Sequence, residues 1–178
     1  TLTYQGVQGS RGVLACYSMM DSSSRVALVA NYWSGSVAMF PAREDGSLGE
    51  ACSFHQHQGT GPDPARQEGP HAHCIVLSAD DAFAFSADLG TDRIYGYRVD
   101  RERLELVPEQ ELELPAGIRR CTLVLPTSLV VCRQSPQSLQ SLRLQPLACH
   151  HGPILKGRAI YQRKALQEAP PVEVEGVL

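Results

Sequence analysis

The chain has 178 residues, an apolar content of 43% and a charged content of 20%, values typical of one globular domain. Its formal net charge of −3 provides no basic field for nucleic acid or an acidic membrane surface. No apolar run approaches the roughly 18 residues that a membrane-spanning helix needs. The six cysteines show no CxxC spacing, so we expect reduced, mostly buried thiols in a cytoplasmic protein.

A repeat occupies the first part of the chain. Residues 12–40 and 69–97 align at a constant offset of 57, which pairs Gly12 with Gly69 and Phe40 with Tyr97. Each copy contains a short strand, a Ser/Asp turn, a denser apolar strand, a Gly/Ser turn and a strand of alternating apolar and polar residues. This alternation indicates half-buried strands, and the turns contain the residues that tolerate tight turns.

The structure of two further segments can be predicted from their composition. Residues 55–70, HQHQGTGPDPARQEGP, are rich in proline and glycine and are expected to form a loop. Residues 101–114, RERLELVPEQELEL, have a helix-like composition, but Pro108 would interrupt a helix. We therefore predict that this segment forms the outer strand of the second copy.

A third, weaker copy begins at Gly117, where CTLVL stands in the place of HCIVL. Copies of three to four short strands at a period of roughly 45 to 57 residues are typical of propeller blades. The predicted fold is all-β: a partial β-propeller over residues 1–145, with blades near 12–50, 69–115 and 117–145. Residues 146–178 remain unassigned, with a short helix expected around 160–169.

Three motifs connect this repeat to a known family. VANYWSGSVAMFPAREDGSLGEA, GTGPDPARQEGPHAH and SADLGTDRIYGYRVD occur in this order within residues 12–115. Together they resemble the 6-phosphogluconolactonase-like lactonases, which are seven-bladed β-propellers. The resemblance implies about three of seven blades, a cytosolic location, no cofactor, and hydrolysis of 6-phosphogluconolactone in the pentose phosphate pathway.

The resemblance also implies site residues. A related branch of the family, which acts on carboxy-muconate, is proposed to use a histidine, an arginine and a glutamate. These fall on His71, on Arg119 and on Gln134, where glutamine replaces the ionisable residue. A histidine common in the first blade of the family is Tyr17 here.

His71 and His73 are the candidate site histidines. Lactone opening needs a base of near-neutral pKa, and histidine fits because its unperturbed pKa is about 6.5. The two residues lie two apart, so an extended backbone would direct them to the same side. Alternatively, they are turn histidines that bond to backbone carbonyls, or they join His55 and His57 in a metal site.

The loop before these histidines contains candidate substrate-binding residues. Arg66 could hold a substrate phosphate, with Glu68 beside it; alternatively the two form a surface ion pair. Asn31 and Asp88 occupy matching places in the two copies, which favours a structural duty such as bonding turn amides.

Tyr32 and Trp33 are aromatic residues in an otherwise small-residue turn. They fit either packing between blades or stacking on a sugar ring.

The implied ligand is a small lactone, without nucleic acid, membrane or metal. Three blades leave open sheet edges, so a partner or oligomer that covers them is also expected. Two rival functions remain open: a non-catalytic propeller fragment or interaction module, and a cyclase of the carboxy-muconate type.

Overall fold

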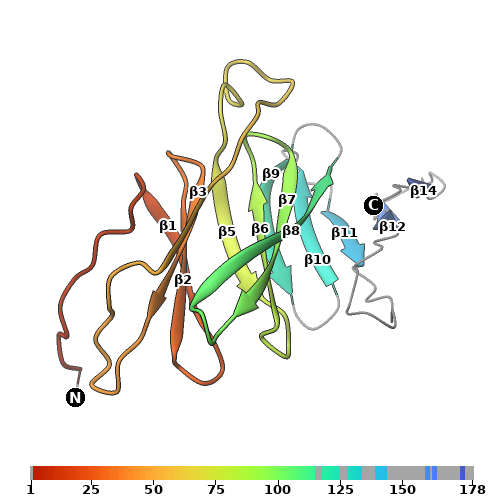
Figure 1. Cartoon of the computed structure of the whole chain (residues 1–178). Helices are drawn as coiled ribbons and strands as arrows, with labels where there is room; N and C mark the ends of the chain where they lie inside the picture. Colours follow the sequence, from red (N-terminus) through yellow and green to blue (C-terminus); the bar gives the residue numbers. More distant parts are fainter. Residues whose placement is uncertain are drawn as a thin grey trace. The chain divides into compact units, whose positions relative to one another are not determined.

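The computed structural model (Figure 1) describes residues 2–114 with their side chains. Beyond them it describes the backbone of the strands at 118–124, 128–133, 139–143, 159–160, 162–163 and 173–174. The chain divides into two compact units, residues 1–116 and 117–178. None of the residues so described is helical, and hence none forms a helix that could cross a membrane.

The first unit consists of two four-stranded antiparallel sheets. The first sheet has the order β1 (Ala15–Met20), β2 (Val26–Asn31), β3 (Ser36–Pro41) and β4 (Ser53–Gln56). The second has the order β5 (Ala72–Leu77), β6 (Phe83–Asp88), β7 (Arg93–Asp100) and β8 (Glu105–Glu113). Four strands in chain order are the arrangement of a propeller blade, so the predicted fold class is confirmed. The strand predicted within residues 101–114 is also confirmed as β8.

The two sheets share one apolar core. Leu28 and Met39 of the first sheet pack with Ile75, Leu77 and Leu106 of the second, and all five are fully buried. Burial of a side chain of this size contributes about 1.5–3 kcal/mol, so these contacts are the main force that holds the sheets together.

Strand β3 is buried on both of its faces. Val37 and Met39 face the shared core, whereas Ala38 and Phe40 form a second cluster with Phe54. A strand covered on both sides reads as a continuous apolar run, which explains the sequence SVAMF.

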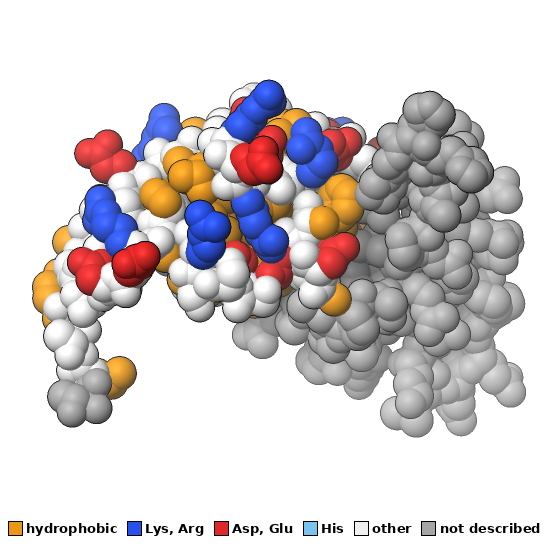
Figure 2. Space-filling view, turned by 60° about the horizontal axis from the view of Figure 1, so that its bottom comes forward, with side chains coloured by type: hydrophobic (Ala, Val, Ile, Leu, Met, Phe, Trp, Pro, Cys, Tyr) orange, Lys and Arg blue, Asp and Glu red, His pale blue; other side chains and the backbone are white. Residues whose placement is uncertain are grey.

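A polar network joins the two copies at the turns β1–β2 and β5–β6. The Ser22 N–H donates to Asp81 Oδ2 at 2.8 Å, and Arg101 lies 3.2 Å from that carboxylate and 3.7 Å from Asp21. On the face turned forward in Figure 2, arginine and acidic side chains are interspersed. The pairing of Arg101 with Asp21 and Asp81 connects the two neighbouring turns.

The prediction of buried thiols holds for one of the three cysteines described with side chains. Cys74 is buried, and this burial raises its pKa to about 11. Cys16 and Cys52 are exposed free thiols, so for them the prediction was wrong.

The second unit contains the third copy. Its sheet has the order β9 (Ile118–Val124), β10 (Ser128–Arg133), β11 (Leu139–Arg143) and β13 (Gln162–Arg163). A separate pair joins β12 (Ala159–Ile160) to β14 (Glu173–Val174). Ile160 and Gln162–Arg163 are strands, so the helix expected around 160–169 was wrong there; its remaining residues lie outside the described part.

The three sheets share an irregularity between their first two strands. In the pairing register, Cys16 in the first sheet, His73 in the second and Arg119 in the third have no partner. Such a bulge turns the side chains that follow it. Arg119 therefore corresponds to His73 in backbone register, and the sequence match of CTLVL with HCIVL is shifted by two residues.

Candidate functional site

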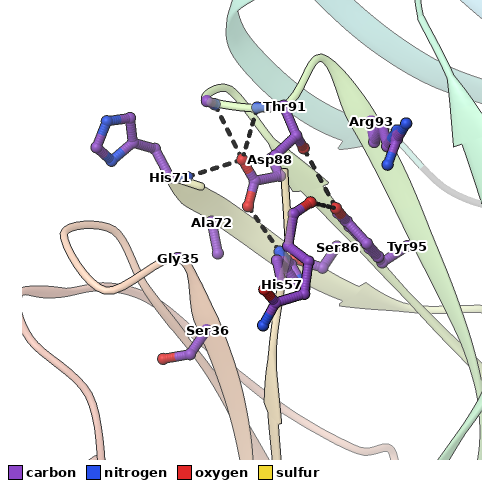
Figure 3. Close-up of polar contacts among 12 residues, drawn as sticks. Gly35, Ser36, His57, His71, Ala72, Ser86, Asp88, Thr91, Arg93 and Tyr95 are labelled. Atoms are coloured by element: carbon purple, nitrogen blue, oxygen red, sulfur yellow. Dashed lines mark hydrogen bonds and ion pairs between the residues drawn. The ribbon is translucent and has the colours of Figure 1, made fainter. Parts of the chain in front are cut away.

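His71 lies directly before β5, and Asp88 fixes its backbone. The His71 N–H donates to Asp88 Oδ1 at 2.7 Å, and the His71 carbonyl accepts from the Leu89 N–H at 2.9 Å. Figure 3 shows the imidazole pointing away from Asp88 while its backbone lies against the carboxylate. The position of His71 is thus set by its main chain.

Asp88 organises the turn that follows β6. Its Oδ1 also accepts the N–H groups of Gly90 at 2.9 Å and Thr91 at 3.1 Å, and its Oδ2 accepts from His57 Nδ1 at 2.7 Å (Figure 3). Asp88 is only 1% exposed, so these donors replace the water that a buried carboxylate loses. The structural duty predicted for Asp88 is confirmed.

His57 completes this buried network. Its Nε2 lies 3.0 Å from the Tyr97 hydroxyl, and its ring stacks on Tyr95 with centroids 3.8 Å apart. Burial raises the pKa of Tyr97, so its phenol stays protonated. Both ring nitrogens of His57 have protein partners, which assigns it a structural role. Sequence analysis suggested only a metal-ligand role for His57. Its structural role was missed because its partners lie 31 and 40 residues away in the chain.

The His71 ring is held by the turn between β2 and β3. Its Nδ1 lies 3.2 Å from the Tyr32 carbonyl, and a carbonyl can only accept, so Nδ1 carries a proton in this contact. The Tyr32 ring stacks on it at 4.8 Å and 10°, and the Trp33 ring lies 6.0 Å away at 39°. The remaining nitrogen, Nε2, is 3.7 Å from Glu68 Oε1.

Gly35 allows the β2–β3 turn to approach the loop before β5. Its φ of 58° is in the left-handed region, and a Cβ at this position would overlap Pro70. Its carbonyl also accepts the His57 N–H at 3.0 Å. Only glycine tolerates both the left-handed φ and the close contact with Pro70. The glycine of the SGS sequence therefore allows this turn, which includes Tyr32, to lie against the loop that carries His71.

These contacts equip His71 for proton transfer. With Nδ1 donating to a carbonyl, Nε2 is the nitrogen that can accept a proton. Glu68 Oε1, 3.7 Å from Nε2, lies within ion-pair distance of the imidazolium that results. Glu68 is 58% exposed, so solvent weakens this pairing.

The other predicted site residues near His71 are His73 and Arg66. His73 lies at the bulge of β5, edge-on to Tyr32 with ring centroids 6.1 Å apart. Arg66 is exposed, and its guanidinium forms no ion pair with any residue whose side chain is described. The alternative Arg66–Glu68 surface pair is therefore not formed, since Glu68 turns to His71.

Gln67 is a residue that sequence reasoning missed. It is 4% exposed, donates from Nε2 to the Leu89 carbonyl at 2.8 Å, and accepts the Asp63 N–H at 3.0 Å. A buried glutamine between two charged residues anchors the loop, and it leaves Arg66 and Glu68 on the outside.

The metal alternative finds no support in these contacts. His55 directs Nε2 to the Leu106 carbonyl at 2.6 Å, and His57 has the partners given above. The residues with described side chains contain no cluster of three or more potential metal ligands.

Arg119 and Gln134 belong to the second unit. The backbone of Arg119 lies in β9, whereas its side chain and all of Gln134 lie outside the described residues. Their part in the site remains a prediction.

The chain resembles known proteins in both sequence and fold. A 6-phosphogluconolactonase of Bacillus subtilis strain 168 is 38% identical over 98 residues, which are 55% of this chain and 28% of that protein. A 6-phosphogluconolactonase of Formosa agariphila is 28% identical over 81 residues, 46% of this chain and 23% of that protein. The periplasmic gluconolactonase of Pseudomonas aeruginosa, a solved structure, matches with a TM-score of 0.68 and 28% identity, over 87% of this chain and 43% of that one.

The matched regions span less than a third of these curated relatives and less than half of the solved structure. The family profile described as "Lactonase, 7-bladed beta-propeller" matches residues 1–119, more than half of the chain. The protein therefore belongs to the seven-bladed β-propeller lactonase family.

Proposed function

We propose that the protein hydrolyses the lactone of a sugar acid, with 6-phosphogluconolactone as the favoured substrate and 6-phosphogluconate as the product. Membership of the lactonase family supports the reaction class. The observation that carries the proposal is the His71 ring, whose Nδ1 is held by the Tyr32 carbonyl at 3.2 Å. This contact leaves Nε2 as the proton acceptor.

In the proposed reaction, His71 acts as a general base. Nε2 takes a proton from water as the water oxygen bonds to the lactone carbonyl carbon, giving a tetrahedral intermediate. The intermediate collapses when the bond from carbon to the ring oxygen breaks, and the imidazolium returns the proton to that oxygen. The product is an open-chain hydroxy acid, and Glu68 stabilises the imidazolium between the two steps.

The developing oxyanion needs donors, since such groups supply much of the rate in acyl transfer. We assign this role to Arg119, as the family resemblance implies. In backbone register Arg119 matches His73 of the second sheet. The His73 ring lies edge-on to Tyr32, which also stacks on His71. This equivalence gives Arg119 the bulge position of its own sheet.

The choice between a phosphorylated and a plain lactone depends on Arg66 in this proposal. The named relatives include both 6-phosphogluconolactonases and a gluconolactonase. Arg66 is exposed on an anchored loop, and a guanidinium can bind a phosphate through two hydrogen bonds. The pentose phosphate pathway and a cytoplasmic location follow only if the phosphorylated substrate is correct.

A second candidate function is lactone or sugar-acid binding without turnover. Gln134 favours it, because glutamine stands where the family resemblance places a glutamate and it cannot ionise. The two candidates differ in one measurable property, which is the release of acid from the lactone.

The test is lactone hydrolysis in a pH-stat, corrected for the spontaneous reaction, with the full chain. His71→Asn is the sharpest variant, because its amide can still donate to the Tyr32 carbonyl but offers no base. We expect His71→Asn and His71→Ala to lower kcat about 10²–10⁴-fold. Arg66→Met should raise KM for 6-phosphogluconolactone and leave KM for gluconolactone unchanged.

A His71→Asn rate equal to that of the unmodified chain would remove His71 from the reaction. Absence of acid release from the unmodified chain, together with saturable binding of 6-phosphogluconate, would favour the binding function.

A further inference from the structure

Trp33 is an aromatic side chain that the core does not use. It is the only tryptophan of the chain, and it is 63% exposed. Packing between the two described sheets, the commoner fate of an aromatic residue, does not apply to it. Its ring instead lies 6.0 Å from that of His71, in a surface region close to the proposed proton acceptor.

The backbone holds Trp33 in this place. Its N–H donates to the Val13 carbonyl at 3.1 Å, and the next turn residue but one, Gly35, is pressed against Pro70. The turn is therefore fixed at both ends, and the exposure of the indole is not the result of a loose loop. Because few alternative positions are available, a ligand would meet an already placed ring.

The groups around the indole define the chemistry of its ligand. Tyr32 stacks on one face of the His71 ring, and His71 is only 6% exposed, whereas the neighbouring Trp33 ring is open to solvent. The indole is apolar, and the His71 imidazole beside it has the Glu68 carboxylate 3.7 Å from its Nε2. A ring with C–H groups on its face and polar groups at its rim fits this combination.

We propose that Trp33 forms a stacking subsite for the sugar ring of the lactone, with the lactone carbonyl directed to His71. This inference rests on the proposed lactonase function and adds a specificity-determining residue to it. The subsite recognises the ring that phosphorylated and plain sugar lactones have in common, whereas Arg66 would distinguish between them.

The subsite should affect binding more than the chemical step. Stacking is made equally with the lactone and with the transition state, so its loss raises KM and leaves kcat nearly unchanged. We expect Trp33→Ala to raise KM about tenfold or less, and Trp33→Phe, which keeps an aromatic face, to restore most of the affinity.

The experiment uses the emission of Trp33 itself, since no other tryptophan contributes. The full chain is titrated with the δ-lactams of 6-phosphogluconic acid and gluconic acid, which keep the ring and its carbonyl group but resist hydrolysis, and binding is also followed by calorimetry. A saturable change in emission, with weaker calorimetric binding for Trp33→Ala than for Trp33→Phe, is the expected result. Tyr4→Ala, which removes another exposed aromatic ring, serves as the control and should bind as the unmodified chain does.

Calorimetric binding of equal strength in Trp33→Ala, or binding without any change in emission, would overturn the subsite. The absence of any binding would also overturn it. The expected binding result without acid release would leave the subsite standing while contradicting the proposed catalysis, so the two failures are distinguishable.

Discussion

The turns after Asn31 and Asp88 occupy the same place in the two copies of the repeat, but different bonds hold them. In the second copy, the Asp88 carboxylate accepts the amides of Gly90 and Thr91. In the first, Asn31 Nδ2 donates to the Ser10 carbonyl and to Ser36 Oγ, and its buried Oδ1 has no hydrogen-bond partner within residues 2–114. The Asp88 carboxylate therefore accepts hydrogen bonds from its turn, whereas the Asn31 carboxamide donates hydrogen bonds from its nitrogen.

The two turns also differ two residues after Asn31 and Asp88. Gly90 is drawn inward by Asp88, and a Cβ there would overlap the Gly69 carbonyl. Trp33, its counterpart at the offset of 57, bonds outward to the Val13 carbonyl at 3.1 Å and stays exposed. The turn after Asp88 is thus closed around a glycine, whereas the turn after Asn31 presents an exposed indole near His71.

Removal of the Asp88 carboxylate should have the largest effect on stability. Asp88→Ala leaves the His57 ring and three backbone amides without their acceptor in a buried site. We expect a loss of about 3–5 kcal/mol in the free energy of unfolding, measured by urea denaturation. Hydrolysis should fall too, because the His71 N–H loses its partner.

Asn31→Ala is the matched variant in the first copy. It removes two hydrogen bonds of a neutral side chain, which corresponds to about 1–3 kcal/mol. Equal losses in the two variants would show that the carboxylate has no special importance.

Gly90→Ala should have the second largest effect. The added methyl group must displace the Gly69 carbonyl, and such overpacking costs about 1–3 kcal/mol. Gly69→Ala is the control, because a Cβ at Gly69 meets no atom within 4 Å. The thermal unfolding midpoint of Gly90→Ala should therefore decrease, whereas that of Gly69→Ala should change little; the opposite order would contradict the closed turn.

Most of the first unit could be predicted from local patterns. The offset of 57 and the alternation of SVAMF and RIYGYRV predicted the strands, because side-chain burial repeats every second residue. Pro108 correctly decided β8 against a helix. The matching positions of Asn31 and Asp88 correctly indicated a structural duty for the aspartate.

What sequence reasoning missed depends on contacts between distant residues. His57 pairs with a carboxylate 31 residues away, and no local pattern marks it. Glu68 turned to His71 and not to Arg66, because the buried Gln67 sets the orientation of the loop. The two-residue shift of Arg119 relative to the CTLVL match appears only in the strand pairing, because the position of a bulge carries no sequence signal.

The smallest expected effect is a pH dependence of stability that arises from His55. His55, two residues before the Asp88 partner His57, donates from Nε2 to the Leu106 carbonyl at 2.6 Å. Burial lowers the pKa of His55 below its ordinary 6.5, and the bond to Leu106 only partly opposes this. The unfolded chain then binds a proton more readily than the folded one, so stability is fully present above pH 6.5 and decreases as the pH falls from 6.5 toward the folded value.

We therefore expect the urea midpoint to decrease modestly from about pH 7.5 to about pH 5.5, and His55→Gln, whose amide can still donate to Leu106, to reduce this decrease. Because the Asp88 network is untouched in His55→Gln, the variant should keep the stability of the unmodified chain at the higher pH. An unchanged pH profile would mean that His55 does not contribute to it.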